Sequence, residues 1–440
     1  DGLPDINNTF LDIKAKQFIT NYADAVQIYP ELRKIKQPAL QQISYLKFKG
    51  SFTGFIKDFV TYGTIQTNLG SVTSDINLKL PNGKEPIYSG KLKTDGFELG
   101  RFLNNENIGS ISMDGSLKGK SFTLNKLFAE IDGNIRQINL YGYNYKNITA
   151  KGIVDKRTFD GALAVNDSNI NVNLSGLVDF GKDTPLYRLN GMVYQLNFKP
   201  LGISGNDLSF KGVIDFNFKV KSIEDFMGVA LIQNAELLHK GEKLSFDSLY
   251  LSNQEITPGL QQLTLRSNEI DALLKGKYNL VYFPDIVMAF LHNYFPAYIS
   301  KPSRQIAVQD FSFDIKTKKI SEFIDLLNTP VKGFDYSTIK GNINIGQNKL
   351  TLETNVPGFT YKNVLFDNVT ISGNGNFSDL NLNGSVSSVN ISDSLRLPNS
   401  SFVIHAANDT GSVSIKTSAS KTLKDADLKA KFLAAKEGFT

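Results

Sequence analysis

Apolar and polar residues alternate along much of the chain. The alternation is clearest in six short segments: 76–80, 170–175, 214–219, 343–345, 350–352 and 380–383. Because successive side chains of a strand point to opposite faces, each segment predicts a β-strand with one apolar and one polar face. Parallel strands covered by helices read instead as continuous apolar runs, so the pattern favours antiparallel strands with one solvated face.

Glycines and turn dipeptides punctuate this pattern. We expect single glycines to mark strand ends, as at Gly133, Gly152, Gly176, Gly191 and Gly212. Asp-Gly and Asn-Gly pairs predict hairpin turns and β-bulges. These pairs lie at 82–83, 95–96, 114–115, 132–133, 190–191 and 383–384. Their spacing is too irregular for a short-repeat β-helix and favours a loose meander.

Few helices are predicted, and all are short. Residues 23–34 form a weak candidate interrupted by a proline, and 98–103 provides one or two turns. The best candidate runs from Asp285, directly after a proline, to Tyr294, with Ile286, Ala289 and Phe290 on the same face as Tyr294. A fourth covers 320–327, with Ser321 as its expected cap.

So few helices cannot cover the apolar faces of so many strands, and those faces must leave water. Three arrangements satisfy this requirement. Sheets can face each other as a series of sandwiches, or a sheet can close into a barrel or solenoid. Alternatively, the sheet curls into a trough whose apolar lining is covered, at least part of the time, by an apolar ligand.

Composition narrows the chemistry. The 440 residues include no cysteine and no tryptophan, so disulfides and thiolate sites are excluded, which mildly favours an oxidising compartment. The formal net charge of +5 is small, and the basic residues form no dense cluster, so we expect no nucleic-acid partner. The most apolar segment, 280–299, contains Asp285, His292 and two prolines, so we expect no membrane-spanning helix.

No catalytic or metal-binding motif stands out. The three histidines, His239, His292 and His405, are far apart in the sequence, and we expect no metal site from them. The chain contains no phosphate-cradling glycine-rich loop, nucleophile elbow or HExxH motif. We therefore expect neither enzymatic activity nor a cofactor.

Several segments, in their order and spacing, resemble the TamB branch of the AsmA-like proteins of Gram-negative envelopes. The distinctive motifs begin with Leu46-Lys47-Phe48-Lys49-Gly50 and continue in residues 51–55, 60–63, 69–72, 97–103, 108–115 and 140–148. The segment 3–6, Leu-Pro-Asp-Ile, also resembles that family's spacer between repeats. The general pattern of residues resembles the family over most of the chain, but the distinctive motifs lie between about Leu46 and Asp179.

The resemblance implies a fold and a function. Such proteins are anchored in the inner membrane by an N-terminal helix and cross the periplasm as a rolled sheet, the β-taco. They are thought to carry phospholipid toward the outer membrane, and the TamB branch also assists outer-membrane protein assembly with an Omp85-type barrel. The sequence shows no N-terminal anchor and no recognisable barrel-contacting domain, so we expect an internal segment whose membrane association depends on other parts.

We therefore predict an all-β fold, an elongated antiparallel sheet curled into a β-taco with an open hydrophobic groove and a few short helices. The predicted divisions are an entry strand and short helix over 1–45, groove repeats over 46–283, helical insertions over 284–330, and further groove over 331–440.

The predicted function is a periplasmic lipid conduit between the two membranes, with phospholipid acyl chains as its partner. The groove would be lined by alternating apolar residues: Phe48, Phe52, Ile76, Leu78, Ile170, Val172, Leu174, Phe216, Phe218, Val220, Ile343 and Ile345. Each buried lipid methylene contributes about 0.8 kcal/mol, so no chemically special residue is needed. One alternative is a scaffold for outer-membrane protein assembly beside an Omp85-type barrel, and a weaker one is a glycan-binding or glycan-degrading β-protein.

Overall fold

The structure is a computed structural model of the whole chain. It describes residues 8–439 apart from 29, 37, 124, 223–225, 240, 305–308, 327–329, 377, 393–394 and 419–424. The segment 3–6, which carries part of the family resemblance, and Leu327 of the fourth predicted helix lie outside the described residues.

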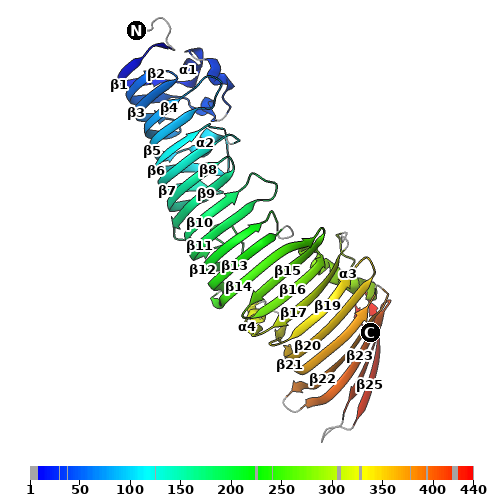
Figure 1. The fold of residues 1–440 in the computed structure, drawn as a ribbon. Helices are drawn as coiled ribbons and strands as arrows, with labels where there is room; N and C mark the ends of the chain where they lie inside the picture. Colours follow the sequence, from blue (N-terminus) through cyan, green and yellow to red (C-terminus); the bar gives the residue numbers. More distant parts are fainter. Residues whose placement is uncertain are drawn as a thin grey trace. The chain divides into compact units, whose positions relative to one another are not determined.

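The fold is all-β and antiparallel, as predicted. Strands make up 65% of the chain and helices 10%, and the sheet is not closed into a barrel. Figure 1 shows the strands following one another side by side within each part of the chain. The first twelve strands are β1 (Leu11–Thr20), β2 (Leu46–Phe55), β3 (Asp58–Thr67), β4 (Gly70–Lys79), β5 (Ile87–Phe97), β6 (Ile108–Lys120), β7 (Phe128–Leu140), β8 (Tyr143–Asp155), β9 (Thr158–Asn166), β10 (Ile170–Asp179), β11 (Leu186–Asn197) and β12 (Leu208–Lys219).

The second half of the chain contributes fourteen further strands among the described residues. They are β13 (Met227–His239), β14 (Glu242–Thr257), β15 (Leu260–Ser267), β16 (Ile270–Lys277), β17 (Asp310–Thr317), β18 (Val331–Gly333), β19 (Thr338–Asn344), β20 (Lys349–Tyr361), β21 (Val364–Gly375), β22 (Leu380–Ser392), β23 (Leu395–Ala407), β24 (Thr410–Thr417), β25 (Ala426–Ala435) and β26 (Gly438–Phe439).

The chain divides into two compact units. Unit 1 comprises residues 1–217 and 236–241, and unit 2 comprises residues 218–235 and 242–440. In unit 1, each strand from β1 to β11 pairs with the next. In unit 2, β14 to β17 pair in order, β17 continues to β19, and β19 to β25 follow in order, while the short β18 pairs with β20.

The predicted helices all form, as short segments. They are α1 (Tyr22–Ile28), α2 (Leu99–Leu103), α3 (Phe283–Tyr294) and α4 (Ser321–Leu326), with 3-10 turns over Pro30–Lys34, Leu40–Gln42 and Leu280–Tyr282. The cap of α4 differs from the expectation, because the Asp335 carboxylate accepts hydrogen bonds from the amides of Ile320 and Ser321. No helix of the described residues is long and apolar enough to cross a membrane.

The prediction that single glycines mark strand ends is wrong. Gly133, Gly152, Gly176, Gly191 and Gly212 all lie inside strands. Some of these glycines lie directly opposite another glycine on the neighbouring strand. Gly152 of β8, for example, pairs with Gly161 of β9. A Cβ on Gly152 would lie 2.7 Å from the Gly161 Cα, so these positions allow the backbones to approach closely. Most Asp-Gly and Asn-Gly pairs also lie within strands, whereas 82–83 forms a turn and 95–96 lies at a bulge in β5.

Four neighbouring strands of unit 2 bend at the same level. Strand pairing skips Pro357, Asn368, Ser387 and Asn399, and it resumes on the other side with unchanged register. Asn368 adopts a left-handed backbone with φ of 48°. The bend changes the face of the sheet on which the next side chains lie. Residues three positions apart in the sequence, on either side of the bend, therefore lie on the same face. We call this level the corner.

Candidate functional site

The apolar positions of each unit gather on one face of the sheet, which we call the inner face. In unit 1 they form rows that cross the strands in register. One row crosses β7 to β11 through Ile135, Ile148, Val165, Val172 and Val193. The adjacent row consists of Gly133, Ala150, Leu163, Leu174 and Gly191. These rows run perpendicular to the strands with no polar residue in them.

Helix α2 covers only part of the inner face of unit 1. Leu99 and Phe102 of α2 pack beside Phe97, Ile111 and Ile138. Farther along the strands, several inner-face side chains remain partly exposed: Leu117, Ile131, Leu163, Leu174 and Leu189. A closed sandwich core would bury such leucines, so this face retains apolar surface in contact with solvent.

The opposite face of unit 1 carries paired charged residues. Charged residues of opposite sign pair across neighbouring strands. Asp132 of β7 lies opposite Lys151 of β8, and their carboxylate and ammonium groups are 3.0 Å apart. Lys79 and Asp58 form a similar exposed pair at 3.1 Å. Exposed pairs contribute little stability, but they identify this face as the solvated one.

Unit 2 contains an apolar cavity of about 550 Å³ on its inner face. Its volume falls within the range of small-molecule sites, roughly 300–1,000 Å³. Fourteen of its sixteen lining residues are apolar, and they come from β19 to β24 and from Phe334. The lining residues are Phe334, Ile339, Thr354, Val356, Phe359, Phe366, Val369, Ile371, Val386, Val389, Leu397, Ser400, Phe402, Ile404, Val413 and Ile415.

The corner supplies much of this lining. In each of four strands, two lining residues lie three positions apart on either side of the bend: Val356 and Phe359, Phe366 and Val369, Val386 and Val389, and Leu397 and Ser400. The valines at 356, 369 and 386 are buried and form the core of this region. The bend thus folds two stretches of the same strands around one apolar space.

Aromatic rings lie over glycines on the inner face of unit 2. Phe402 faces Gly384 directly across β22 and β23, and Phe313 faces Gly341 in the same way. A Cβ on Gly384 would lie 2.2 Å from Phe402 Cζ. The missing side chain therefore gives the ring room to lie against the sheet, which keeps it low in the cavity wall.

Helix α3 covers another part of the inner face of unit 2 (Figure 1). Its buried residues Ile286, Phe290 and Tyr294 pack in a cluster with Phe311 and Ala406. The C-terminal end is tied to the β23–β24 turn, since the Asp409 amide donates to the Tyr294 carbonyl at 2.9 Å and the Ala297 amide donates to the Asp409 carboxylate at 2.7 Å. Burial, reinforced by the negative charge of Asp379, raises the pKa of Tyr294 to about 12.

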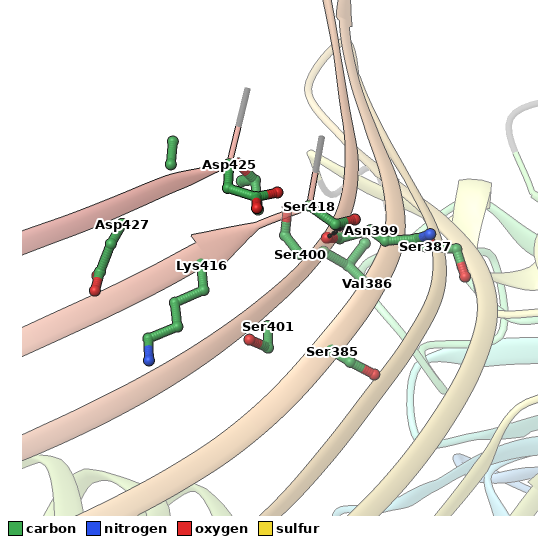
Figure 2. A pocket seen from close by; sticks show the side chains of 12 residues that line it. Ser385, Val386, Ser387, Asn399, Ser400, Ser401, Lys416, Ser418, Asp425 and Asp427 are labelled. Carbon is green, nitrogen blue, oxygen red and sulfur yellow. Dashed lines mark hydrogen bonds between the residues drawn. The ribbon is translucent and has the colours of Figure 1, made fainter. Parts of the chain in front are cut away.

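A second, polar pocket of about 690 Å³ lies against β22 to β25 (Figure 2). Ser385, Ser401, Lys416 and Asp427 face one another in register along it. They alternate with inner-face residues, so they lie on the opposite face of the sheet from the apolar cavity. Figure 2 also shows the strands curving beside Ser387 and Asn399, the skipped corner residues. These side chains have no arrangement typical of a catalytic site.

The predicted lining residues lie in β2, β4, β10, β12 and β19, or directly after a strand. Phe52 and Ile76 belong to the inner face of unit 1, where Phe52 also contacts Phe59 with 4.6 Å between ring centroids. Ile343 and Ile345 pack against the α3 cluster. None of the twelve predicted residues is among those that line the apolar cavity, which sequence reasoning missed. The pairs of apolar residues three apart around Pro, Gly, Asn or Ser were the signal for it.

The histidines stay separate. His239 belongs to β13, the His292 Nδ1 lies 2.6 Å from the Ile299 carbonyl oxygen, and the His405 Nδ1 lies 2.9 Å from the Asn381 side-chain oxygen. In the part of the chain that the structure describes, no three His, Cys, Asp or Glu residues converge as metal ligands.

Comparison with known proteins gives no relative, because no protein-family model, no curated protein and no solved structure matches this chain.

Proposed function

We propose that the chain is a lipid-transfer segment that holds acyl chains against its apolar inner face. The observation that carries this proposal is the cavity of about 550 Å³, with fourteen apolar residues among the sixteen in its wall. The partly exposed apolar side chains on the inner face of unit 1, such as Leu163 and Leu174, support it, because they offer an acyl chain a dry surface on neighbouring strands. Each methylene that leaves water contributes about 0.8 kcal/mol, so ten methylenes contribute about 8 kcal/mol before the cost of ordering the chain.

The cellular setting belongs to the same proposal. The resemblance to the TamB branch favours a periplasmic segment of a Gram-negative envelope that carries phospholipid between the inner and outer membranes. The absence of cysteine agrees with an oxidising compartment. We propose a binding role without catalysis, a cofactor or nucleic acid, and membrane association through parts outside this segment.

The test compares two adjacent residues of β21. Ile371 lines the apolar cavity, whereas Ser372 is exposed on the opposite face. The wild-type chain and the variants Ile371→Asp and Ser372→Asp would be purified, extracted with organic solvent and examined by lipid mass spectrometry. We expect phospholipid with the wild type and Ser372→Asp, and a loss of most of it with folded Ile371→Asp. Circular dichroism checks that each variant is folded.

Two results would contradict this function. One is a wild-type chain that neither copurifies with lipid nor binds added phospholipid in vesicles. The other is a folded Ile371→Asp chain that retains as much lipid as Ser372→Asp.

A scaffold role in outer-membrane protein assembly is the second candidate. It is favoured by β1, whose described backbone pairing is with β2 and whose Ile13 and Phe18 are 46% and 54% exposed. An edge of this kind can accept an added strand from an unfolded β-protein or from an Omp85-type partner. Binding of unfolded outer-membrane protein peptides by a chain that carries no lipid would favour this role over lipid transfer.

A further inference from the structure

Phe334 reaches the apolar cavity of unit 2 from the link between β18 and β19. Its ring stacks on the ring of Phe359 with 5.2 Å between centroids, and Phe359 stacks in turn on Phe366 at 4.8 Å. All three residues line the cavity. The three rings therefore form a continuous aromatic wall on one side of the corner.

The backbone of Phe334 is held in a strained conformation. Its φ is 71°, in the left-handed region that bulky residues rarely adopt and glycine adopts readily. The Phe334 amide donates a hydrogen bond to the Gly358 carbonyl at 3.1 Å, and the Thr317 hydroxyl donates one to the Phe334 carbonyl. Glycine would suit this backbone better, so what phenylalanine adds at this position is a ring in the cavity.

The two ends of the cavity differ. Phe334 follows Gly333, which pairs with Phe359, the first residue of a row of lining residues that crosses β20 to β23: Phe359, Phe366, Val389 and Leu397. Strand β17, on the Phe334 side, ends at Thr317 and adds no residue to the cavity wall. At the opposite end, the lining residue Ile415 of β24 pairs with Leu428 of β25, which is 57% exposed. An apolar chain can therefore enter beside Leu428 and run across the strands toward Phe334.

The size of the cavity fits one acyl chain. A methylene takes about the volume of a water molecule, roughly 30 Å³, so the cavity of about 550 Å³ has room for about eighteen carbons. The lining strands β19 to β24 span about 24 Å at roughly 4.8 Å between neighbours, which is about the length of a stretched chain of that size. None of the sixteen lining residues is charged, so a charged headgroup stays outside the cavity.

We propose that Phe334 is the end stop for an acyl chain in this cavity and thereby sets the chain length that unit 2 prefers. The terminal methyl lies against the Phe334 ring, and the carboxyl or headgroup end lies beside Leu428. This inference rests on the proposed function and adds to it the orientation and the length of the bound chain. Carbons beyond about eighteen extend past Leu428 into water and add nothing to the affinity.

The experiment measures how affinity depends on chain length. Saturated fatty acids of about ten to about twenty-four carbons displace a fluorescent fatty-acid probe from the full chain after removal of bound lipid. In the wild type, each added methylene should strengthen binding about fourfold up to about eighteen carbons, where the dissociation constant levels off. Phe334→Ala should raise this limit by about three carbons, because the ring leaves space for about three methylenes. Phe334→Leu should raise it less.

Tyr336→Ala is the matched control. Tyr336 is also an aromatic residue with a left-handed backbone, at a φ of 56°, but it is 61% exposed and does not line the cavity. Its replacement should leave the chain-length limit unchanged. A second measurement uses the wild type alone. A fatty acid with a photoreactive group at its terminal methyl should crosslink to residues beside Phe334, and one with the group next to its carboxyl should crosslink to residues of β25.

The inference is overturned if wild-type affinity keeps rising well beyond the expected limit, or if folded Phe334→Ala keeps the wild-type limit. It is also overturned if Tyr336→Ala shifts the limit equally, or if both photoreactive fatty acids label the same residues. Should Phe334→Ala not fold, Phe334→Gly removes the ring together with the backbone strain and gives the same comparison. A wild-type chain that binds none of the fatty acids overturns the proposed function together with this inference, whereas binding with an unmoved limit overturns the inference alone.

Discussion

Replacing Gly384 with alanine tests how the cavity of unit 2 is kept open. The added methyl would lie 2.2 Å from Phe402 Cζ and 2.6 Å from the Thr370 carbonyl oxygen. Both distances are well below van der Waals contact, so the ring must rise from the sheet and β22 must shift. Overpacking of this kind costs about 1–3 kcal/mol. Because Phe402 lines the cavity, its ring then occupies part of the space that an acyl chain would fill.

A double-mutant cycle separates the two contacts. Phe402→Leu shortens the side chain and removes the clash with the ring, whereas the contact with the Thr370 carbonyl remains. We expect Gly384→Ala to cost less in the Phe402→Leu background by about 1 kcal/mol or more, measured by denaturant unfolding. Lipid content should fall in Gly384→Ala and recover in the double variant. Equal costs in both backgrounds, with unchanged lipid content, would refute the role that we assign to this glycine.

Two further predictions concern α3. Phe290 is 4% exposed, so Phe290→Ala should lower the free energy of unfolding of unit 2 by about 3–5 kcal/mol, whereas Val287→Ala, at a position 56% exposed on the same helix, should change it by about 0.5 kcal/mol or less. Hydrogen exchange in α3 and denaturant unfolding measure both, and similar effects of the two variants would contradict the seating of α3 on the sheet. Tyr294→Phe tests the buried phenol. Because the folded-state pKa of about 12 lies above the ordinary value of 10.0, stability from this group is complete below pH 10 and is lost as the pH rises toward 12. Melting temperatures from pH 8 to 12 should therefore fall less steeply in Tyr294→Phe, and parallel curves would count against burial of this hydroxyl.

Period-two alternation was sufficient to predict the strand class, because a strand has only two faces and one of them must leave water. The segments 170–175 and 214–219 accordingly lie within β10 and β12. Helix α3 was also predictable, since its buried residues Ile286, Phe290 and Tyr294 recur every four positions. Both features depend on local spacing alone.

The cavity depends on something that local spacing does not reveal. At the corner of unit 2 the strand rotates without gaining a residue, so Val356 and Phe359 face the same space although they have opposite parity. An alternation pattern assigns such residues to different faces, and it predicts no continuous strand across the corner. The predicted groove residues consequently lie in regular stretches, among them Ile343 and Ile345, which pack against the cluster that contains the buried residues of α3.

Helix α3 also indicates what the inner face of unit 2 accepts. The helix presents Ile286, Phe290 and Tyr294 to a row of sheet residues and leaves each of them less than 5% exposed. Its polar contacts to the sheet lie at its C-terminal end, around Asp409, and the middle of the helix contributes apolar surface. An acyl lipid has the same division, with a polar end and an apolar length. The cavity shares β19, β20, β22 and β23 with the row that α3 covers, and no residue of α3 lines it. We therefore propose the cavity as the place in unit 2 where a separate molecule of this kind completes the core.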